Sequence, residues 1–200
     1  MEIMQGKNTR PMDAVEFGLR TAGYREVLLD VGTGDGRFVL EAARRNAGLL
    51  AIGMDACREN LRGAARAGGA GGNALFVIAG ASRLPAELHG LAGRVTINFP
   101  WGSLRDGLLN GEPALLEGLL AVMRPGARLE VRLNASALAE AGWELLPGGE
   151  RVRDWLDWAG FNPRPVRLLD AAALRALPST WAKRLAFSRR PEAIALEGKG

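Results

Sequence analysis

Cysteine, histidine and tyrosine each occur only once in the 200 residues. A single cysteine, Cys57, cannot build a disulfide framework within the chain, and such a composition is typical of a reducing cytoplasm. The one histidine, His89, lies in an expected surface loop, so it is not placed to act as a general base. We therefore predict no metal site and no histidine-based catalysis.

Long apolar runs are also missing. The first 16 residues contain no apolar stretch of signal-peptide length, and no segment approaches the roughly 18 to 20 apolar residues of a membrane span. The composition, 48% hydrophobic and 24% charged, is that of a globular protein. We expect one domain over residues 1–200, cytoplasmic, monomeric and without a membrane partner.

Lysine is scarce, and most of the 26 basic residues are arginine. The net charge of +4 is unevenly placed, because basic and acidic residues balance over 1–149 while basic residues exceed acidic ones over 150–200. Genome composition alone would explain the arginine bias. The placement instead favours a basic C-terminal surface for an anionic partner.

Short apolar runs alternate with helical patterns along the chain. Such alternation predicts an α/β protein with a mostly parallel sheet covered on both faces. The first 20 residues are expected to form a β-hairpin. A breaker, Arg124-Pro125-Gly126, separates a helix from the fifth expected strand. The expected strands are 26–31, 49–55, 74–79, 95–99, 128–133, 165–169 and 193–197, and the expected helices are 37–46, 58–66, 113–123 and 154–159.

The strongest local motif is Asp30-Val-Gly-Thr-Gly-Asp-Gly36, between the first strand and the first helix. Glycines there permit a tight turn and let backbone N–H groups approach a ligand closely. The dinucleotide fingerprint would need a third glycine at position 37, which is Arg37 here. The alternative that the glycines only make a turn and the aspartates only cap helices stays open at this point.

The two carboxylates around this loop favour S-adenosylmethionine, which carries an ammonium and a sulfonium group and no phosphate. Asp30 can hold the ammonium region, directly or through water, by charge-assisted hydrogen bonds. Asp55 ends the second strand, where a carboxylate accepts hydrogen bonds from both ribose hydroxyls. Both side chains are expected to face the ligand, so replacing either with alanine would abolish cofactor binding and leave a folded protein. The segment around Ala81 is expected to flank the cofactor's adenine.

Two tryptophans stand outside apolar patterns. Trp101 follows the fourth strand in Asn98-Phe-Pro-Trp-Gly-Ser103, and Trp181 lies in a polar, basic segment. Stacking on a nucleobase would account for both, and packing under a loop is the alternative. Lys183, Arg184, Arg189 and Arg190 cluster within eight residues, as expected for phosphate contacts or for a solvated surface.

Three motifs together resemble the kanamycin–apramycin resistance family, the 16S rRNA (adenine-1408) N1-methyltransferases. They are LDVGTGDGR at 29–37, FPWGSL at 99–104 and STWAKRLAFSRR at 179–190. The resemblance implies a class I methyltransferase with a Rossmann-like fold, whose seven-stranded, mostly parallel sheet has an antiparallel last strand. It also implies S-adenosylmethionine as cofactor, 16S rRNA in the 30S subunit as substrate, and aminoglycoside resistance as outcome.

The resemblance assigns roles to particular residues. Trp101 and Trp181 would sandwich a flipped adenine beside Pro100, without a general base, because the adenine N1 lone pair is already free. The RNA contacts would be Arg62, Arg66, Lys183, Arg184, Arg189 and Arg190. The cofactor contacts would be Asp30, Gly32, Thr33, Gly34, Asp55, Ala56, Ala81, Ser82, Leu84 and Ser103.

The chain departs from that family at several places. Ser82 stands where an acidic residue is frequent, Pro191 where an arginine is found, and the stretch 135–155 is short. The segment 62–72 offers two arginines in place of several lysines. Two alternatives therefore stay open: a cofactor-binding homologue with weak activity, and a methyltransferase for another RNA or a small molecule.

Overall fold

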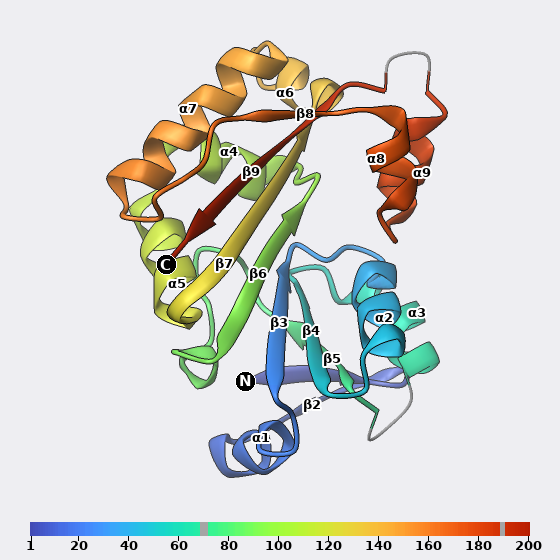
Figure 1. Cartoon of the computed structure of the whole chain (residues 1–200). Coiled ribbons are helices and arrows are strands. Elements are labelled where there is room, and N and C mark those ends of the chain that lie inside the picture. The colour runs from blue at the N-terminus through green and yellow to red at the C-terminus, as the bar shows by residue number, and fades with distance from the viewer. Residues whose placement is uncertain (69–71, 189–190) are drawn as a thin grey trace.

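The computed structural model describes residues 1–68, 72–188 and 191–200, as strands alternating with helices (Figure 1). The strands are β1 (Glu2–Gln5), β2 (Asn8–Pro11), β3 (Glu26–Val31), β4 (Leu49–Asp55), β5 (Ala74–Ile78), β6 (Ala92–Asn98), β7 (Met123–Asn134), β8 (Arg167–Leu169) and β9 (Ala193–Lys199). The helices are α1 (Ala14–Thr21), α2 (Arg37–Arg45), α3 (Arg58–Gly68), α4 (Gly102–Asn110), α5 (Pro113–Val122), α6 (Ala135–Glu140), α7 (Leu145–Trp158), α8 (Ala171–Ala176) and α9 (Thr180–Ala186), with a short 3₁₀ turn at Ala86–Leu88.

The strands form one sheet in the order β2-β1-β5-β4-β3-β6-β7-β9-β8. The neighbours from β5 to β7 pair in parallel, and β9 lies antiparallel between β7 and β8. The strand order reverses between β4 and β6, on either side of β3, so the loop after β3 opens at a topological switch point. Ligands of open α/β sheets bind at such a point, beyond the carboxyl ends of the strands.

Two apolar cores cover the two faces of the sheet. On one face α1, α4, α5 and α7 pack against alternate residues of the central strands, such as Leu29 and Ile52. On the other face α2 and α3 pack against the intervening residues, such as Leu28 and Ala51. Because both faces are covered, the central strands are continuously apolar. For this reason the sequence alone predicts them.

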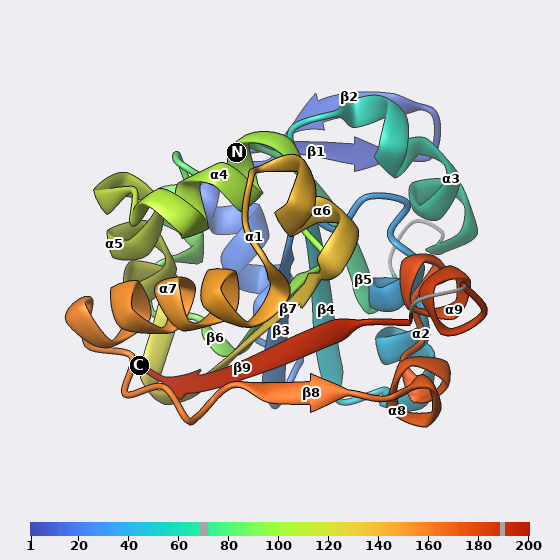
Figure 2. The ribbon, with the colours of Figure 1, turned by 90° about the horizontal axis from the view of Figure 1, so that it is seen from above.

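A third, smaller core lies at the C-terminal end of the sheet. Leu174 of α8 and Ala182 of α9 pack with Phe99, Leu169 and Ala193. This core seats α8 and α9 above α2, at the carboxyl edge of the sheet (Figures 1 and 2). In the part of the chain that the structure describes, no helix combines the length and the apolar character needed to cross a membrane.

The structure confirms the fold class and corrects its details. The N-terminal hairpin forms over residues 2–11 only, and the helix α1 occupies 14–21 of the stretch that was expected to be hairpin. The hairpin also joins the sheet through β1 and β5, where Ile3 pairs with Val77, so the sheet has nine strands and not seven. The expected breaker at 124–126 is wrong as a boundary. β7 begins at Met123, and the three residues lie in an irregularity of the β6–β7 register, with Gly126 at φ +75°. Residues 102–110 and 171–186, for which no element was predicted, contain α4, α8 and α9.

One glycine is required by packing as well as by conformation. Gly111 ends α4 with φ +64°, and a Cβ there would stand 2.2 Å from the Trp155 ring. Gly142 has a similar φ of +80° but nothing within 4 Å of its Cβ position. The two positions therefore separate the cost of the left-handed backbone from the cost of a steric clash.

We predict that Gly111→Ala lowers the free energy of unfolding by about 3–5 kcal/mol, since a clash in a packed site adds to the left-handed strain. Gly142→Ala, the matched control, should lose only the strain, about 1–2 kcal/mol. Urea denaturation of the parent and both variants measures the difference. Equal losses in the two variants would contradict the packing role of Gly111.

Candidate active site

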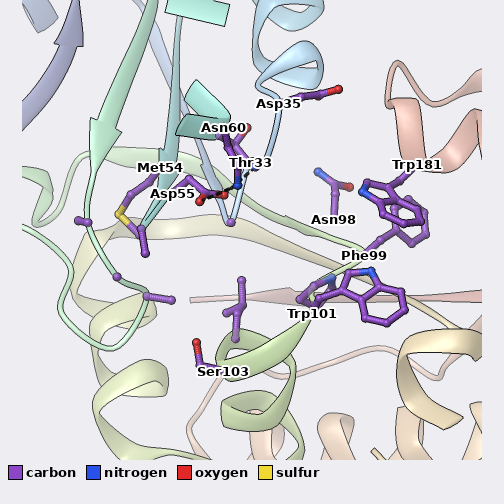
Figure 3. Close-up of a pocket in the computed structure, with 18 of the residues that line it drawn as sticks. Thr33, Asp35, Met54, Asp55, Asn60, Asn98, Phe99, Trp101, Ser103 and Trp181 are labelled. Atoms are coloured by element: carbon purple, nitrogen blue, oxygen red, sulfur yellow. Dashed lines mark hydrogen bonds between the residues drawn. The ribbon is translucent and has the colours of Figure 1, made fainter. Parts of the chain in front are cut away.

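A cavity of about 570 Å³ lies beyond the carboxyl ends of β3, β4, β5 and β6 (Figure 3). Each strand contributes the segment that follows it, and α9 closes one side. Parallel strands bring their carboxyl ends to one edge, so residues far apart in sequence meet there. The lining comprises 32–35, 54–56, Asn60, 79–82, 98–101, 103–104, Glu112, Leu115, Thr180, Trp181 and Arg184.

The glycine loop after β3 forms the floor of the cavity. Gly32 and Gly34 have φ values of +70° and +57°, which favour glycine. At Gly32 a Cβ would also stand 2.5 Å from a methyl carbon of Leu104. The N–H groups of Gly32 and Thr33 donate to the Met54 carbonyl over 2.8 and 2.9 Å. These bonds tie the loop to the end of β4 and leave its surface open to a ligand.

Asp55 lines the cavity at the end of β4, where the sequence predicted it. Its Oδ2 accepts a hydrogen bond from the Gly34 N–H over 2.9 Å, and its Oδ1 accepts one from the Cys57 N–H over 2.9 Å. The amide of Asn60 donates to the same Oδ1 over 3.3 Å. The carboxylate is thus oriented by its own loop and by the glycine loop, and it is only half-buried.

Asp30 lies elsewhere than expected. Its side chain is 1% exposed and does not line the cavity. Its oxygens accept hydrogen bonds from the hydroxyls of Thr33 and Thr96, each over 2.6 Å, and from the Asn98 amide over 2.8 Å. The expectation that Asp30 faces the ligand is wrong, because the carboxylate is used to join the glycine loop to the end of β6.

The burial of Asp30 has an electrostatic cost. Burial raises the pKa of its carboxyl above the ordinary range, while the three hydrogen bonds and the positive charge of Arg132 act against that rise. Arg132 also donates to the Asn98 Oδ1 over 2.7 Å, so Asn98 links the carboxylate to the guanidinium. The Asp30–Asn98–Arg132 chain connects β3, β6 and β7 below the cavity.

Trp101 and Trp181 meet at the mouth of the cavity, although they are 80 residues apart (Figure 3). Their ring centroids are 5.9 Å apart and the ring planes are inclined by 36°. The exposed fractions are 36% for Trp101 and 49% for Trp181, unusually high for tryptophan. The structure therefore brings the two rings together and leaves both partly in solvent, as a surface that takes a flat aromatic ligand requires.

The turn that carries Trp101 is strained. Phe99 has φ +53°, rare for a residue with a side chain, and its ring is buried in the third core. Its N–H donates to the Arg132 carbonyl over 2.8 Å. Pro100 follows in the cavity wall, and Trp101 caps the N-terminus of α4 with an extended backbone. The buried Phe99 thus turns the chain so that Trp101 faces the cavity.

All but one of the remaining residues predicted around the cofactor and the base line the cavity. Thr33, Ala56, Ala81, Ser82 and Ser103 line the cavity together with Gly32, Gly34 and Pro100. Leu84 does not line it, because its side chain packs towards Gly118 of α5. Sequence reasoning missed Asp35, Asn60, Glu112 and Thr180 as cavity residues. Asp35 and Thr180 lie within the glycine-loop motif and the motif at 179–190, and Asn98 lies at a strand end, so these three carried a local signal, whereas nothing in the local pattern marks Asn60 or Glu112.

The predicted RNA contacts are dispersed. Arg184 borders the cavity with its guanidinium carbon 5.9 Å from the Trp181 ring centroid. Lys183 faces a neighbouring cleft. Arg62 and Arg66 lie exposed on α3, outside the cavity, and Arg62 pairs with Glu59 at 3.7 Å. Arg189 and Arg190 lie outside the described residues.

The charge of the cavity identifies the kind of cofactor that fits. Among the described residues of its lining, Asp35, Asp55 and Glu112 oppose a single cation, Arg184. An acidic cavity disfavours a pyrophosphate and suits the ammonium and sulfonium groups of S-adenosylmethionine. Together with the strand order and the antiparallel β9, this cavity defines a class I S-adenosylmethionine-dependent methyltransferase.

Comparison with known proteins gives the family. The family model described as 16S rRNA (adenine(1408)-N(1))-methyltransferase matches residues 2–199. Curated proteins of that name are 35% identical in Streptoalloteichus tenebrarius, covering 99% of this chain and 98% of that protein, and 30% identical in Escherichia coli, with 99% and 98% covered. The chain therefore belongs to the 16S rRNA (adenine(1408)-N(1))-methyltransferase family.

Solved structures agree with this placement. The 16S rRNA methyltransferase KamB superposes with a TM-score of 0.89 at 34% identity, covering all of this chain and 99% of that one. A variant of the Catenulisporales acidiphilia 16S rRNA (adenine(1408)-N(1))-methyltransferase, solved with its cosubstrate SAM, gives a TM-score of 0.86 at 30% identity, with 100% and 96% covered. Both likenesses span the whole sheet and its loops.

The two aspartates should respond differently to replacement with alanine. Asp55→Ala should stay folded and bind S-adenosylmethionine about 10- to 100-fold more weakly, the cost of lost hydrogen bonds to a charged acceptor. Asp30→Ala should lower the free energy of unfolding by about 3–5 kcal/mol, because it leaves buried donors without a partner. Calorimetry and urea denaturation measure the two effects, and a fully stable Asp30→Ala protein would contradict the role derived for this carboxylate.

Proposed function

We propose that this protein transfers a methyl group from S-adenosylmethionine to N1 of adenine 1408 in 16S rRNA, within the 30S subunit, and thereby confers aminoglycoside resistance. The observation that carries the proposal is the Trp101–Trp181 pair at the mouth of an acidic cofactor cavity. Two facing aromatic rings suit an extruded base, and the family supplies the identity of the target.

In this proposal the cofactor lies along the glycine loop. The Asp55 carboxylate accepts the ribose hydroxyls, and the backbone around Gly32 and Gly34 lies against the methionine part. Ser82 and the Ala81 backbone flank the adenine, and Ser103 approaches the methionine part from the other side. Asp30 contributes indirectly, by holding Thr33 and therefore the loop.

In the proposed reaction, catalysis depends on positioning the two reactants and not on general acid–base catalysis. The cofactor supplies a methyl group on a sulfonium, and the adenine N1 lone pair is free at neutral pH, so no base is required. The chain supplies two aromatic rings at the mouth of the cofactor cavity, which would hold N1 in line with the methyl group. The new methyl group blocks the pairing edge of the base and adds positive charge, which opposes cationic aminoglycosides.

The tryptophan pair must open to admit the base. A base between two stacked rings keeps about 3.5 Å to each, so the ring planes must stand about 7 Å apart and nearly parallel. In the structure the centroids are 5.9 Å apart and the planes inclined, so the rings contact each other. We infer that α9, which carries Trp181, shifts when the base enters.

The cations near the pair are proposed to contact rRNA phosphates. Lys183 and Arg184 follow Trp181 on α9, and Arg62 and Arg66 lie separately on the exposed side of α3. Arg189 and Arg190 are proposed to add to this contact. The protein is proposed to act as a monomer, since one chain supplies both the cofactor cavity and the tryptophan pair that the reaction needs, and in the cytoplasm, where 30S subunits are found.

Labelled methyl transfer to intact 30S subunits tests the proposal. Reverse transcription should stop at adenine 1408, because N1-methyladenine cannot pair, and cells that express the protein should gain kanamycin and apramycin resistance. Naked 16S rRNA and small amines serve as alternative acceptors. Transfer to one of these but not to 30S subunits would replace the proposed substrate, and cofactor binding without transfer to any acceptor would indicate a non-catalytic homologue.

The tryptophans give a sharper test. Trp181→Ala should slow methyl transfer about 5- to 150-fold, the loss of about 1–3 kcal/mol of base stacking, and leave cofactor affinity unchanged. Trp101→Ala should act in the same direction, and Trp181→Phe should lose less because a stacking face remains. Trp158→Ala is the matched control, since that ring is 72% exposed on α7 and lies outside the cavity lining. Parental rates in both Trp101→Ala and Trp181→Ala would make these two rings packing residues.

A further inference from the structure

A second cavity lies beside the proposed active site, between α2 and α3 on one side and α8 and α9 on the other. Its volume is about 650 Å³, and we refer to it as the α2–α8 cleft. The cleft and the cofactor cavity share Asp35, Asn60 and Thr180 in their linings. The two spaces therefore adjoin, and a long ligand that enters one can extend into the other.

The α2–α8 cleft is basic. Its lining contains two carboxylates, Asp35 and Glu41, against five cations, which come from both walls: Arg37, Arg44, Arg45, Arg175 and Lys183. The adjoining cofactor cavity has the opposite balance, with three carboxylates and Arg184 among its described lining residues. Two neighbouring spaces of opposite sign are suited to two ligands of opposite charge.

The carboxylates do not neutralise the cations. Glu41 is shared by Arg45 at 2.9 Å and Arg44 at 4.0 Å. Asp35 is 3.5 Å from Arg37 and also accepts a hydrogen bond from the Thr180 hydroxyl over 2.9 Å. Within residues 1–68, 72–188 and 191–200, Arg175 and Lys183 make no ion pair.

Helix dipoles do not explain the arrangement either. Arg44, Arg45 and Arg175 lie in the last turns of α2 and α8, where a cation is favourable. A helix end carries only about half an elementary charge, so it leaves most of the positive charge of its arginines uncompensated. Dipoles also give no reason for cations from distant parts of the chain, on α2, α8 and α9, to line one cleft.

The shape of the cleft suits a nucleic acid strand. Arg37 and Arg44 lie seven residues apart on α2, about 10 Å along the helix axis, which is roughly three steps of a nucleic acid strand at 3.4 Å per step. The opposite wall adds Lys183 and the hydroxyl of Ser179, which are donors for phosphate oxygens. No aromatic ring is among the described residues of the lining, so the cleft fits a backbone and not bases.

We propose that the α2–α8 cleft holds backbone phosphates of the RNA strand that adjoins the methylated nucleotide. The inference rests on the proposed function and adds a contact surface, the α2 wall with Arg37, Arg44 and Arg45 and the α8 wall with Arg175. The strand leaves the target base at the tryptophan pair and passes Thr180 and Asp35 into the cleft. The contact is independent of base sequence and contributes to affinity for the subunit, not to the chemical step.

The test is the double variant Arg44→Glu/Arg175→Glu, which reverses one charge on the α2 wall and one on the α8 wall. Both side chains are exposed and lie outside the cofactor cavity, so the variant should keep the parental affinity for S-adenosylmethionine. Its affinity for 30S subunits should fall roughly 10-fold or more near 0.1 M salt, and the slope of log K against log[salt] should fall by about one for each lost phosphate contact. Methyl transfer at saturating 30S concentration should be unchanged. The neutral variant Arg44→Gln/Arg175→Gln should show a smaller loss in the same direction.

The matched control is Arg25→Glu/Arg128→Glu. These exposed arginines lie near the starts of β3 and β7, at the opposite edge of the sheet, and the charge change is the same. Two results would overturn the cleft as an RNA contact, provided that the parent protein methylates 30S subunits. One is a cleft variant that keeps the parental 30S affinity and salt slope, and the other is an equal loss of affinity in the control variant. A parent that neither binds nor methylates them would overturn the proposed function first, and the cleft's role with it.

Discussion

The site depends on one buried carboxylate, that of Asp30. It accepts three hydrogen bonds at the point where the sheet order reverses, from Thr33 of the glycine loop and from Thr96 and Asn98 of β6. A buried charge is costly to desolvate, and donors on every side make it tolerable here. Because the donors come from two neighbouring strand ends, the same bonds that stabilise the charge also fix the relative position of the cofactor loop and the segment leading to Trp101.

A consequence of this arrangement reaches the substrate side. Asn98 joins Asp30 to Arg132, and the next residue, Phe99, turns with a positive φ and buries its ring in the core beneath α8 and α9. The turn that presents Trp101 and the helix that presents Trp181 therefore rest on one small core. The Thr180–Asp35 hydrogen bond adds a direct link from α9 to the glycine loop. The segments proposed to hold the cofactor and the base are therefore fixed by the same buried core and the same hydrogen bonds.

The elements that the sequence predicted well are those whose pattern is local and repeated. β3 and β4 have the predicted bounds, because strands covered on both faces read as continuous apolar runs between turn residues. The helix at 102–110 was not predicted, since it begins at a glycine with φ +54° directly after Trp101, and the two helices within 171–186 were not predicted because they have only 6 and 7 residues. The N-terminal hairpin was expected, but its pairing with β5 depends on a contact between residues more than 70 positions apart, which no local pattern reports.

By itself, the sequence determined the class of protein and the glycine loop, and it predicted the ribose carboxylate at Asp55 and the two tryptophans as base-binding residues, because each depends on residue types within a short local motif. Only the tertiary structure decided which carboxylate faces the cavity. Asp30 and Asp55 both follow apolar strand residues, but the threonine of a neighbouring strand covers one of them and solvent reaches the other. The tertiary structure also decided where charges collect. The acidic cavity and the basic cleft are each assembled from segments distant in sequence, and a local net charge cannot show which side chains will share a space.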